Sequence, residues 1–312
     1  MKTAFLYCGQ GSQKAGMGKD LYETYPQIRE FFDTKIADFD IKETCFNNTD
    51  GDLNRTRFQQ ASLGAFGAAI TSLLYEHDIV ADASAGLSLG EYIALYAAGV
   101  FDYETMIDLL AYRGKIMEET TCDIDSKMSA ILGLDKELTQ KAVLEASEAT
   151  NKLAVCANYN CPSQIVIGGD AAAVETAEKL CMEFGAKRVV PLNVSGPFHT
   201  PLMQKASEML SKKLEIVNFK PFQIPVIFNV NAKPSTDTKT LTSVLTEQVK
   251  SPVLFEQSIL SLEKMGIDTV IEIGATSTLS SFVKKTSVGI KTHTVDSAES
   301  LGKILKSFGR KT

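Results

Sequence analysis

The chain has 312 residues, of which 44% are hydrophobic and 22% charged, a composition typical of a soluble globular protein with one large domain or about two smaller ones. Its formal charge of −6 argues against nucleic-acid binding, and we expect neither a signal peptide nor a membrane-spanning segment. The six cysteines form no CxxC pair, so we expect a reduced, cytoplasmic protein without a metal site or a disulfide framework.

A glycine-rich turn follows the first predicted strand (Thr3–Tyr7), in the stretch YCGQGSQKAGMG. Turns of this kind often bind phosphate groups. A P-loop would need Lys and then Ser or Thr directly after its last glycine, but Gly18 is followed by Lys19 and Asp20. A dinucleotide-binding turn would need a glycine where Lys14 stands. The turn is therefore not predicted to hold a nucleotide.

Strand-like and helix-like segments alternate along most of the chain, which favours an α/β fold. The clearest of these segments after the first strand are a helix at Gln60–His77, a strand at Ile79–Ala85, a helix at Phe255–Met265 and a strand at Asp268–Ile273.

The strongest local signal is the stretch GLSLG at residues 86–90, which matches G-x-S-x-G between a predicted strand and a predicted helix (Gly90–Ala98). In that context the glycines allow a sharp turn that exposes the hydroxyl of Ser88 as a nucleophile. The N–H of Leu89 would then lie at the helix N-terminus, where it can stabilise a developing oxyanion. The alternative is a chance match, because short Gly/Ser patterns recur in turns.

A predicted helix at Tyr103–Glu119 carries a cation on its apolar face. Hydrophobic residues recur there at intervals of three and four, and Arg113 lies in the middle of them. A buried guanidinium needs a partner, and its planar fork suits a carboxylate. Two interpretations stay open: a structural role, paired with an acid of the protein or reaching the surface, and a substrate with a free carboxylate.

The order of predicted elements changes in the middle of the chain to βαββαβ, the ferredoxin-like arrangement. We expect a small subdomain at residues 123–191, inserted into a large subdomain formed by residues 1–122 and 192–312. Its expected elements are, in order, Met128–Leu134, Lys136–Ala149, Leu153–Asn158, Gln164–Gly168, Ala172–Phe184 and Lys187–Leu192.

A serine nucleophile needs a base, and the chain has three histidines. His77 lies at the polar end of an amphipathic helix, and His293 lies in a predicted late strand. His199 stands in the loop NVSGPFHTPLM between a strand and a helix, where catalytic residues often collect. It is the best candidate, although a loop histidine considered by itself is more often a surface residue.

Several stretches together resemble one family. YCGQGSQKAGMG, GLSLGEYIALYAAGVF, YRGKIMEE, NCPSQIVIGG, VSGPFHTPLM and QVKSPVLFEQSI occur in this order. They resemble the malonyl-CoA:acyl carrier protein transacylases, the acyltransferase family of fatty acid and polyketide synthesis. The resemblance extends from Thr3 to about Val283. It implies an α/β-hydrolase-like large subdomain with a ferredoxin-like insert.

The resemblance also implies a reaction and its central residues. Malonyl would pass from malonyl-CoA to holo acyl carrier protein by a ping-pong mechanism in bacterial fatty acid synthesis. Ser88 would be the nucleophile and His199 the base, with an oxyanion hole formed by the amides of Gln10 and Leu89. No metal or bound cofactor is implied, because CoA and phosphopantetheine are carriers of the substrate.

Further residues match positions that bind or orient in the family. Arg113 matches the arginine that binds the malonyl carboxylate, and Gln248 matches the position whose backbone carbonyl orients the histidine. Phe198 matches the form associated with malonyl rather than branched acyl groups. The chain departs from the family at Cys8, where proline is usual, and at Leu87, where histidine is common. An acidic carrier protein would need a local basic patch, for which Lys187 with Arg188, or Lys284 with Lys285, are candidates.

Two other classes of function stay open at this point. A hydrolase could use the same serine, but it has no obvious need for an arginine on an apolar stripe. A protein that binds the carrier without acyl transfer would not need Gln10, Ser88, Arg113 and His199 together. The sequence does not separate fatty acid from polyketide synthesis.

Overall fold

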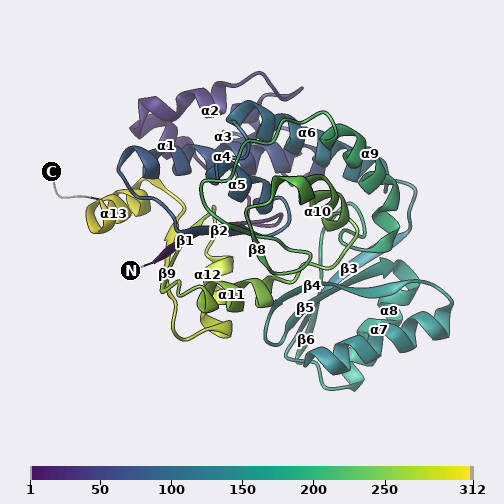
Figure 1. The fold of residues 1–312 in the computed structure, drawn as a ribbon. Coiled ribbons are helices and arrows are strands. Elements are labelled where there is room, and N and C mark those ends of the chain that lie inside the picture. The colour runs from purple at the N-terminus through teal and green to yellow at the C-terminus, as the bar shows by residue number, and fades with distance from the viewer. Residues whose placement is uncertain (1, 310–312) are drawn as a thin grey trace.

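The computed structural model describes residues 2–309, which form two sheets surrounded by helices (Figure 1). The larger sheet has the strand order β10-β9-β1-β2-β7-β8. Its strands run parallel except β8, which pairs antiparallel with β7. Their bounds are β1 (Thr3–Tyr7), β2 (Ala83–Gly86), β7 (Val226–Ile227), β8 (Pro234–Ser235), β9 (Thr269–Ile273) and β10 (Lys291–Val295).

Helices cover both faces of this sheet. Successive side chains of a strand point to opposite faces, so each face carries apolar residues that pack against helices. Phe5 and Tyr7 of β1 pack into one apolar cluster with α4 and α6, whereas Ala4 and Leu6 pack into another with α11 and α12. The helices outside the smaller sheet are α1 (Lys19–Thr24), α2 (Arg29–Asp33), α3 (Ile41–Phe46), α4 (Thr56–Glu76), α5 (Gly90–Ala97), α6 (Tyr103–Glu119), α9 (Gln204–Leu214), α10 (Leu241–Gln248), α11 (Phe255–Lys264), α12 (Thr278–Thr286) and α13 (Ala298–Phe308).

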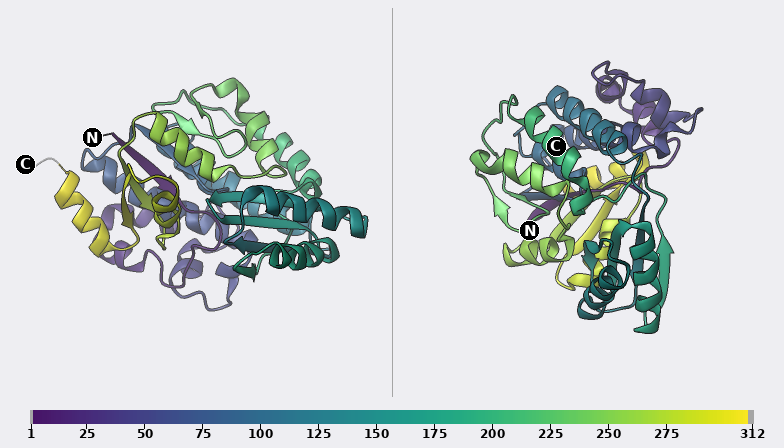
Figure 2. Two further views of the ribbon diagram at one scale, coloured as in Figure 1. Left: turned by 90° about the horizontal axis from the view of Figure 1, so that it is seen from below. Right: turned by 90° about the vertical axis from the view of Figure 1, so that its right-hand side faces the viewer.

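The smaller sheet comes from one continuous stretch of chain and lies to one side of the larger sheet, as both views of Figure 2 show. Its neighbouring strands are antiparallel, in the order β4-β5-β3-β6, with two helices packed on it. The elements are β3 (Ser126–Leu132), α7 (Lys136–Thr150), β4 (Ala154–Cys161), β5 (Gln164–Asp170), α8 (Ala171–Glu183) and β6 (Arg188–Pro191). This is the predicted βαββαβ order, and the predicted α/β class is confirmed.

The exact division into subdomains stays a prediction. All elements of the smaller sheet lie within the predicted range 123–191. Residues 1 and 310–312 of the predicted large subdomain lie outside the described residues. Within residues 2–309, no helix is long and apolar enough to cross a lipid bilayer.

One predicted strand is wrong over its first half. The segment 79–82 is not a strand, and β2 begins at Ala83. Asp82 explains the late start, because its side chain accepts a hydrogen bond from the Thr3 N–H (2.7 Å) and its own N–H donates to the Thr3 carbonyl (2.7 Å). These two bonds fix the segment beside the start of β1, and regular pairing begins at Ala4 with Ala83.

Candidate active site

Ser88 lies on a tight turn between β2 and α5. Its φ of 57° is a left-handed conformation that L-residues rarely adopt, and such strain often marks functional sites. The turn closes because its flanking glycines have no side chain. A Cβ on Gly86 would lie 2.0 Å from the carbonyl carbon of Gly90, and one on Gly90 would lie 2.2 Å from the Tyr7 carbonyl oxygen. The two glycines of the motif are therefore required by close backbone contacts.

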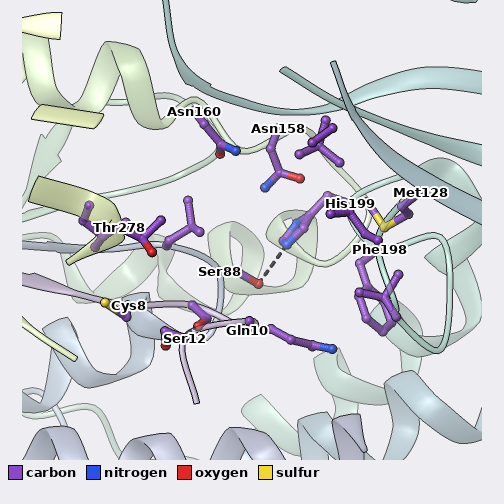
Figure 3. Close-up of a pocket in the computed structure, with 18 of the residues that line it drawn as sticks. Cys8, Gln10, Ser12, Ser88, Met128, Asn158, Asn160, Phe198, His199 and Thr278 are labelled. Atoms are coloured by element: carbon purple, nitrogen blue, oxygen red, sulfur yellow. Dashed lines mark hydrogen bonds between the residues drawn. The ribbon is translucent and has the colours of Figure 1, made fainter. Parts of the chain in front are cut away.

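His199 lies directly beside the hydroxyl of Ser88 (Figure 3). Its Nε2 lies 2.8 Å from Ser88 Oγ, and its Nδ1 lies 2.7 Å from the backbone carbonyl oxygen of Gln248. Gln248 is the last residue of α10, where carbonyl groups lack partners inside the helix. With the Nδ1–H donating to that carbonyl, Nε2 is free to accept the serine proton. The helix C-terminus also stabilises positive charge on the imidazole ring. In Ser-His-Asp triads the Asp carboxylate has this role.

The imidazole is held neutral by its surroundings. His199 is buried, and burial, followed by the positive charge of Arg113, lowers its pKa from 6.5 to about 4. The pKa in the folded chain therefore lies below that in the unfolded chain. The stability linked to this group is fully present above pH 6.5 and is lost as the pH falls from 6.5 through about 4.

The pH dependence of the reaction follows from the same pKa. A base acts in its neutral form, so the rate of Ser88 acylation should stay level from pH 8 down to about pH 5 and fall with a midpoint at about pH 4. Rapid-quench measurements over this range, with acyl donor well below saturation, check the prediction, because under these conditions the rate reports the pKa of the free protein. A midpoint near the ordinary histidine value of about 6.5 would contradict it.

The opening glycine-rich turn packs directly against the serine turn. A Cβ on Gly9 would lie 2.7 Å from the Leu87 carbonyl oxygen. The backbone N–H groups of Gln10 and Leu89 donate no hydrogen bond to any acceptor within residues 2–309. Leu89 precedes the first residue of α5, so its N–H belongs to the unpaired first turn of that helix. Two free amides therefore flank the serine.

Arg113 is completely buried beneath Ser88. Its Nη2 donates to Ser88 Oγ (3.1 Å) and to Gln248 Oε1 (2.9 Å), and its Nη1 donates to Gln60 Oε1 (2.6 Å). All three acceptors are neutral. Within residues 2–309, no carboxylate oxygen lies within 4.0 Å of the guanidinium nitrogens. The structural pair with a protein acid, one of the two interpretations above, is therefore not present in the described chain.

The neighbouring acid does not supply a counter-charge either. Glu91, on the first turn of α5, is also fully buried, and burial raises its pKa to about 8. A carboxyl group with that pKa is mostly neutral at pH 7. The guanidinium consequently carries a buried positive charge without a negative partner, and a buried charge of this kind is stabilised by an anion from outside.

A cavity of about 320 Å³ opens beside Ser88 and His199, between the large sheet and the smaller one, and Arg113 lies outside its lining. Ser88, His199 and Phe198 line it, with Gln10 on one side and Asn158 and Asn160 of β4 on the other (Figure 3). Its lining also includes apolar side chains from both sheets, among them Leu87, Met128, Val166, Leu192 and Phe282. The space suits a thioester-sized group whose carbonyl lies between the two free amides.

The structure brings together the residues predicted to form the site: Gln10, Ser88, Leu89, Arg113, Phe198, His199 and Gln248. The other two histidines do not take part, because His77 is exposed at the end of α4 and the ring of His293 packs edge-to-face with that of Phe308. Three buried polar residues, Gln60, Glu91 and Asn229, contact the site and were not predicted from the sequence.

Comparisons with known proteins place the chain in a family. The model of the acyl transferase domain family matches residues 4–310. The chain belongs to this family. Its closely similar relatives include the malonyl CoA-acyl carrier protein transacylase of Bacillus subtilis, 41% identical over 302 residues that cover 96% of this chain and 95% of that protein.

Solved structures agree with this acyltransferase in the whole fold. The crystal structure of MCAT from Streptococcus pneumoniae is 41% identical, with a TM-score of 0.92 over 98% of this chain and 100% of that chain. A malonyl-transacylase in complex with a type II polyketide synthase acyl carrier protein is 32% identical, with a TM-score of 0.94 over 98% and 99% of the two chains.

Proposed function

We propose that this acyltransferase transfers the malonyl group from malonyl-CoA to the phosphopantetheine thiol of an acyl carrier protein, in the cytoplasm and for bacterial fatty acid synthesis. The proposed substrate rests on Arg113. This buried cation has no anionic partner in the protein and donates a hydrogen bond to Ser88 Oγ. Malonyl is a short acyl group with a free carboxylate, so it fits a site with one unpaired cation beside the nucleophile. The names of the relatives, malonyl CoA-acyl carrier protein transacylases, support the same assignment.

The first half-reaction acylates the serine. The malonyl carboxylate pairs with Arg113, taking the place of the Ser88 hydroxyl at the guanidinium. His199 Nε2 removes the proton from Ser88 Oγ, and the oxygen attacks the thioester carbonyl carbon. The C–S bond then breaks, and the CoA thiolate leaves with the proton held by His199.

The amides of Gln10 and Leu89 stabilise the intermediate of this step. The tetrahedral carbon carries a full negative charge on its oxygen, and both N–H groups are unpaired in the free protein. Each donor of this kind contributes about 3 kcal/mol of transition-state stabilisation in comparable sites. The amides therefore act on the oxyanion rather than on the substrate carbonyl.

The second half-reaction reverses the chemistry on a new thiol. The phosphopantetheine thiol of the carrier protein loses its proton to His199 and attacks the malonyl-serine carbonyl. The C–O bond to Ser88 breaks, and His199 returns the proton to Ser88 Oγ. The proposal needs no metal and no bound cofactor, because each step is a proton transfer or an acyl transfer between groups already named.

Phe198 is proposed to restrict the acyl group. Its ring lines the cavity directly before His199 and is almost entirely buried. A rigid aromatic ring at this place would limit the space for a branch on the acyl α-carbon. The Phe198 ring therefore favours malonyl over methylmalonyl.

The test is the intact mass of the purified protein, taken within seconds of mixing with malonyl-CoA alone. We expect one malonyl adduct on the wild type and none on the Ser88→Ala variant. The wild-type adduct should disappear when holo acyl carrier protein is added. Steady release of CoA without an adduct would instead identify a hydrolase. Equally complete acylation by acetyl-CoA in a parallel sample would remove the role proposed for Arg113.

Docking of the acidic carrier protein is expected at α12. The first turn of this helix lines the cavity through Thr278 and Leu279, and its last turn carries Lys284 and Lys285. Reversing both charges (Lys284→Glu with Lys285→Glu) should raise the KM for the carrier protein by about tenfold. The same reversal at Lys306 of α13 is the matched control and should leave that KM unchanged. An unchanged KM in the double variant would direct attention to Lys187 and Arg188 of the smaller sheet.

A further inference from the structure

The serine turn has a buried side chain that holds its backbone. Asn229 follows β7, next to β2 in the large sheet, and is fully buried. Its Oδ1 accepts a hydrogen bond from the Ser88 N–H (2.7 Å), and its Nδ2 donates to the Gly86 carbonyl oxygen (2.6 Å). The side-chain amide of Asn229 therefore bonds to the turn at both Gly86 and Ser88.

Asn229 is itself fixed in place by its neighbours. Its backbone N–H donates to Glu91 Oε2 (2.6 Å), and its carbonyl oxygen accepts from the Leu254 N–H (2.9 Å). Glu91 lies only three residues after Ser88, on the first turn of α5. The Glu91 side chain thus ties the segment after β7 to the helix that the serine turn begins.

The hydrogen bond from Ser88 also decides which amides of the turn face the substrate. The turn has two N–H groups beside the reacting oxygen, those of Ser88 and Leu89. Asn229 accepts a hydrogen bond from the Ser88 N–H, whereas the Leu89 N–H has no acceptor within residues 2–309. The Ser88 N–H is therefore directed away from the cavity, toward the core.

We infer that Asn229, held by Glu91, is a positioning residue for acyl transfer: it fixes the strained backbone of Ser88 and leaves Leu89 as the single oxyanion donor of the serine turn. Without the Asn229 side chain the Ser88 N–H loses its buried acceptor, and the φ of 57° loses the bond that opposes its relaxation. Ser88 Oγ would then move from its position 2.8 Å from His199 Nε2.

The inference rests on the proposed malonyl transfer, so the test measures acylation of Ser88 by malonyl-CoA in rapid-quench experiments. The Asn229→Ala variant should acylate about 100-fold more slowly, the effect of a misplacement of about 1 Å, with a KM for malonyl-CoA within about twofold of the wild type. Asn231→Ala is the matched control, because Asn231 is an exposed asparagine of the same loop. It should react like the wild type.

Two conservative variants separate positioning from folding. Asn229→Asp keeps an acceptor for the Ser88 N–H but has no donor for the Gly86 carbonyl, so its rate should lie about tenfold above that of Asn229→Ala. Glu91→Gln keeps an acceptor for the Asn229 N–H and should retain acylation within about fivefold of the wild type. If Asn229→Ala does not fold, the comparison of Asn229→Asp with the wild type decides, with a loss of about tenfold expected.

The outcomes distinguish the inference from the proposed function. Wild-type acylation rates in folded Asn229→Ala, or a rise in KM that accounts for the whole loss, would overturn the positioning role. Failure of the wild type itself to form a malonyl adduct would instead overturn the proposed function.

Discussion

Replacing His199 by alanine should slow the acylation of Ser88 by about 10⁴-fold, the upper range of general base catalysis. The Nε2 atom is the acceptor 2.8 Å from Ser88 Oγ, and no other histidine of the described chain contacts that hydroxyl. A serine hydroxyl without a base is a weak nucleophile at neutral pH. Rapid-quench acylation with malonyl-CoA measures the loss, and thermal unfolding shows that the variant is folded.

Two controls make this result specific. His293→Ala removes a histidine that packs edge-to-face with Phe308 and should leave the rate unchanged. The double variant of Ser88→Ala with His199→Ala should show the same residual malonyl transfer to the carrier protein as Ser88→Ala alone, because the two residues act as one unit. A loss of less than about tenfold in His199→Ala would show that another group takes the serine proton.

The fold was largely predictable because the periodicity of its elements is strong. The strand at Thr3–Tyr7, the helix at Tyr103–Glu119 and the βαββαβ order of the smaller sheet all follow from local pattern. The segment 79–82 was predicted wrongly as strand, since its apolar residues resemble the start of β2. The contact of Asp82 with Thr3, 79 residues away along the chain, decides the outcome there, and local pattern does not contain it.

The residues that react or bind substrate could be predicted from the sequence, whereas the buried residues that hold them in place could not. Ser88 and His199 stand in loops with distinctive neighbours, and Arg113 is conspicuous on an apolar helix face. Gln60, Glu91 and Asn229 act through hydrogen bonds across the core, to partners 53 residues away in the case of Gln60 and 141 in that of Asn229. A signal did exist, because each is a polar residue within an otherwise apolar buried stretch. Such residues usually have a buried hydrogen-bond partner, but the sequence does not say which.

Replacing Arg113 by alanine should change the acyl group that the enzyme accepts. Malonyl transfer should fall by at least about 10³-fold in kcat/KM, because the buried carboxylate would be left without a positive partner. Acetyl transfer should stay level or increase, because the acetyl group has no carboxylate that needs a positive partner. The space left by the Arg113 side chain is also bordered by the apolar ring face of Tyr92. Paired assays with malonyl-CoA and acetyl-CoA measure the ratio.

The pH dependence of acetyl transfer gives this variant a second, independent readout. The charge of Arg113 is one of the causes that lower the pKa of His199, so its removal should raise that pKa above about 4. The acid limb of the acetyl-transfer rate should therefore move to higher pH in Arg113→Ala than in the wild type. Lys213→Ala removes a half-buried cation paired with Asp108 and should leave the limb in place. Equal loss of both acyl activities, with an unmoved acid limb, would make Arg113 a structural residue and would leave malonyl selection to Phe198 and the shape of the cavity.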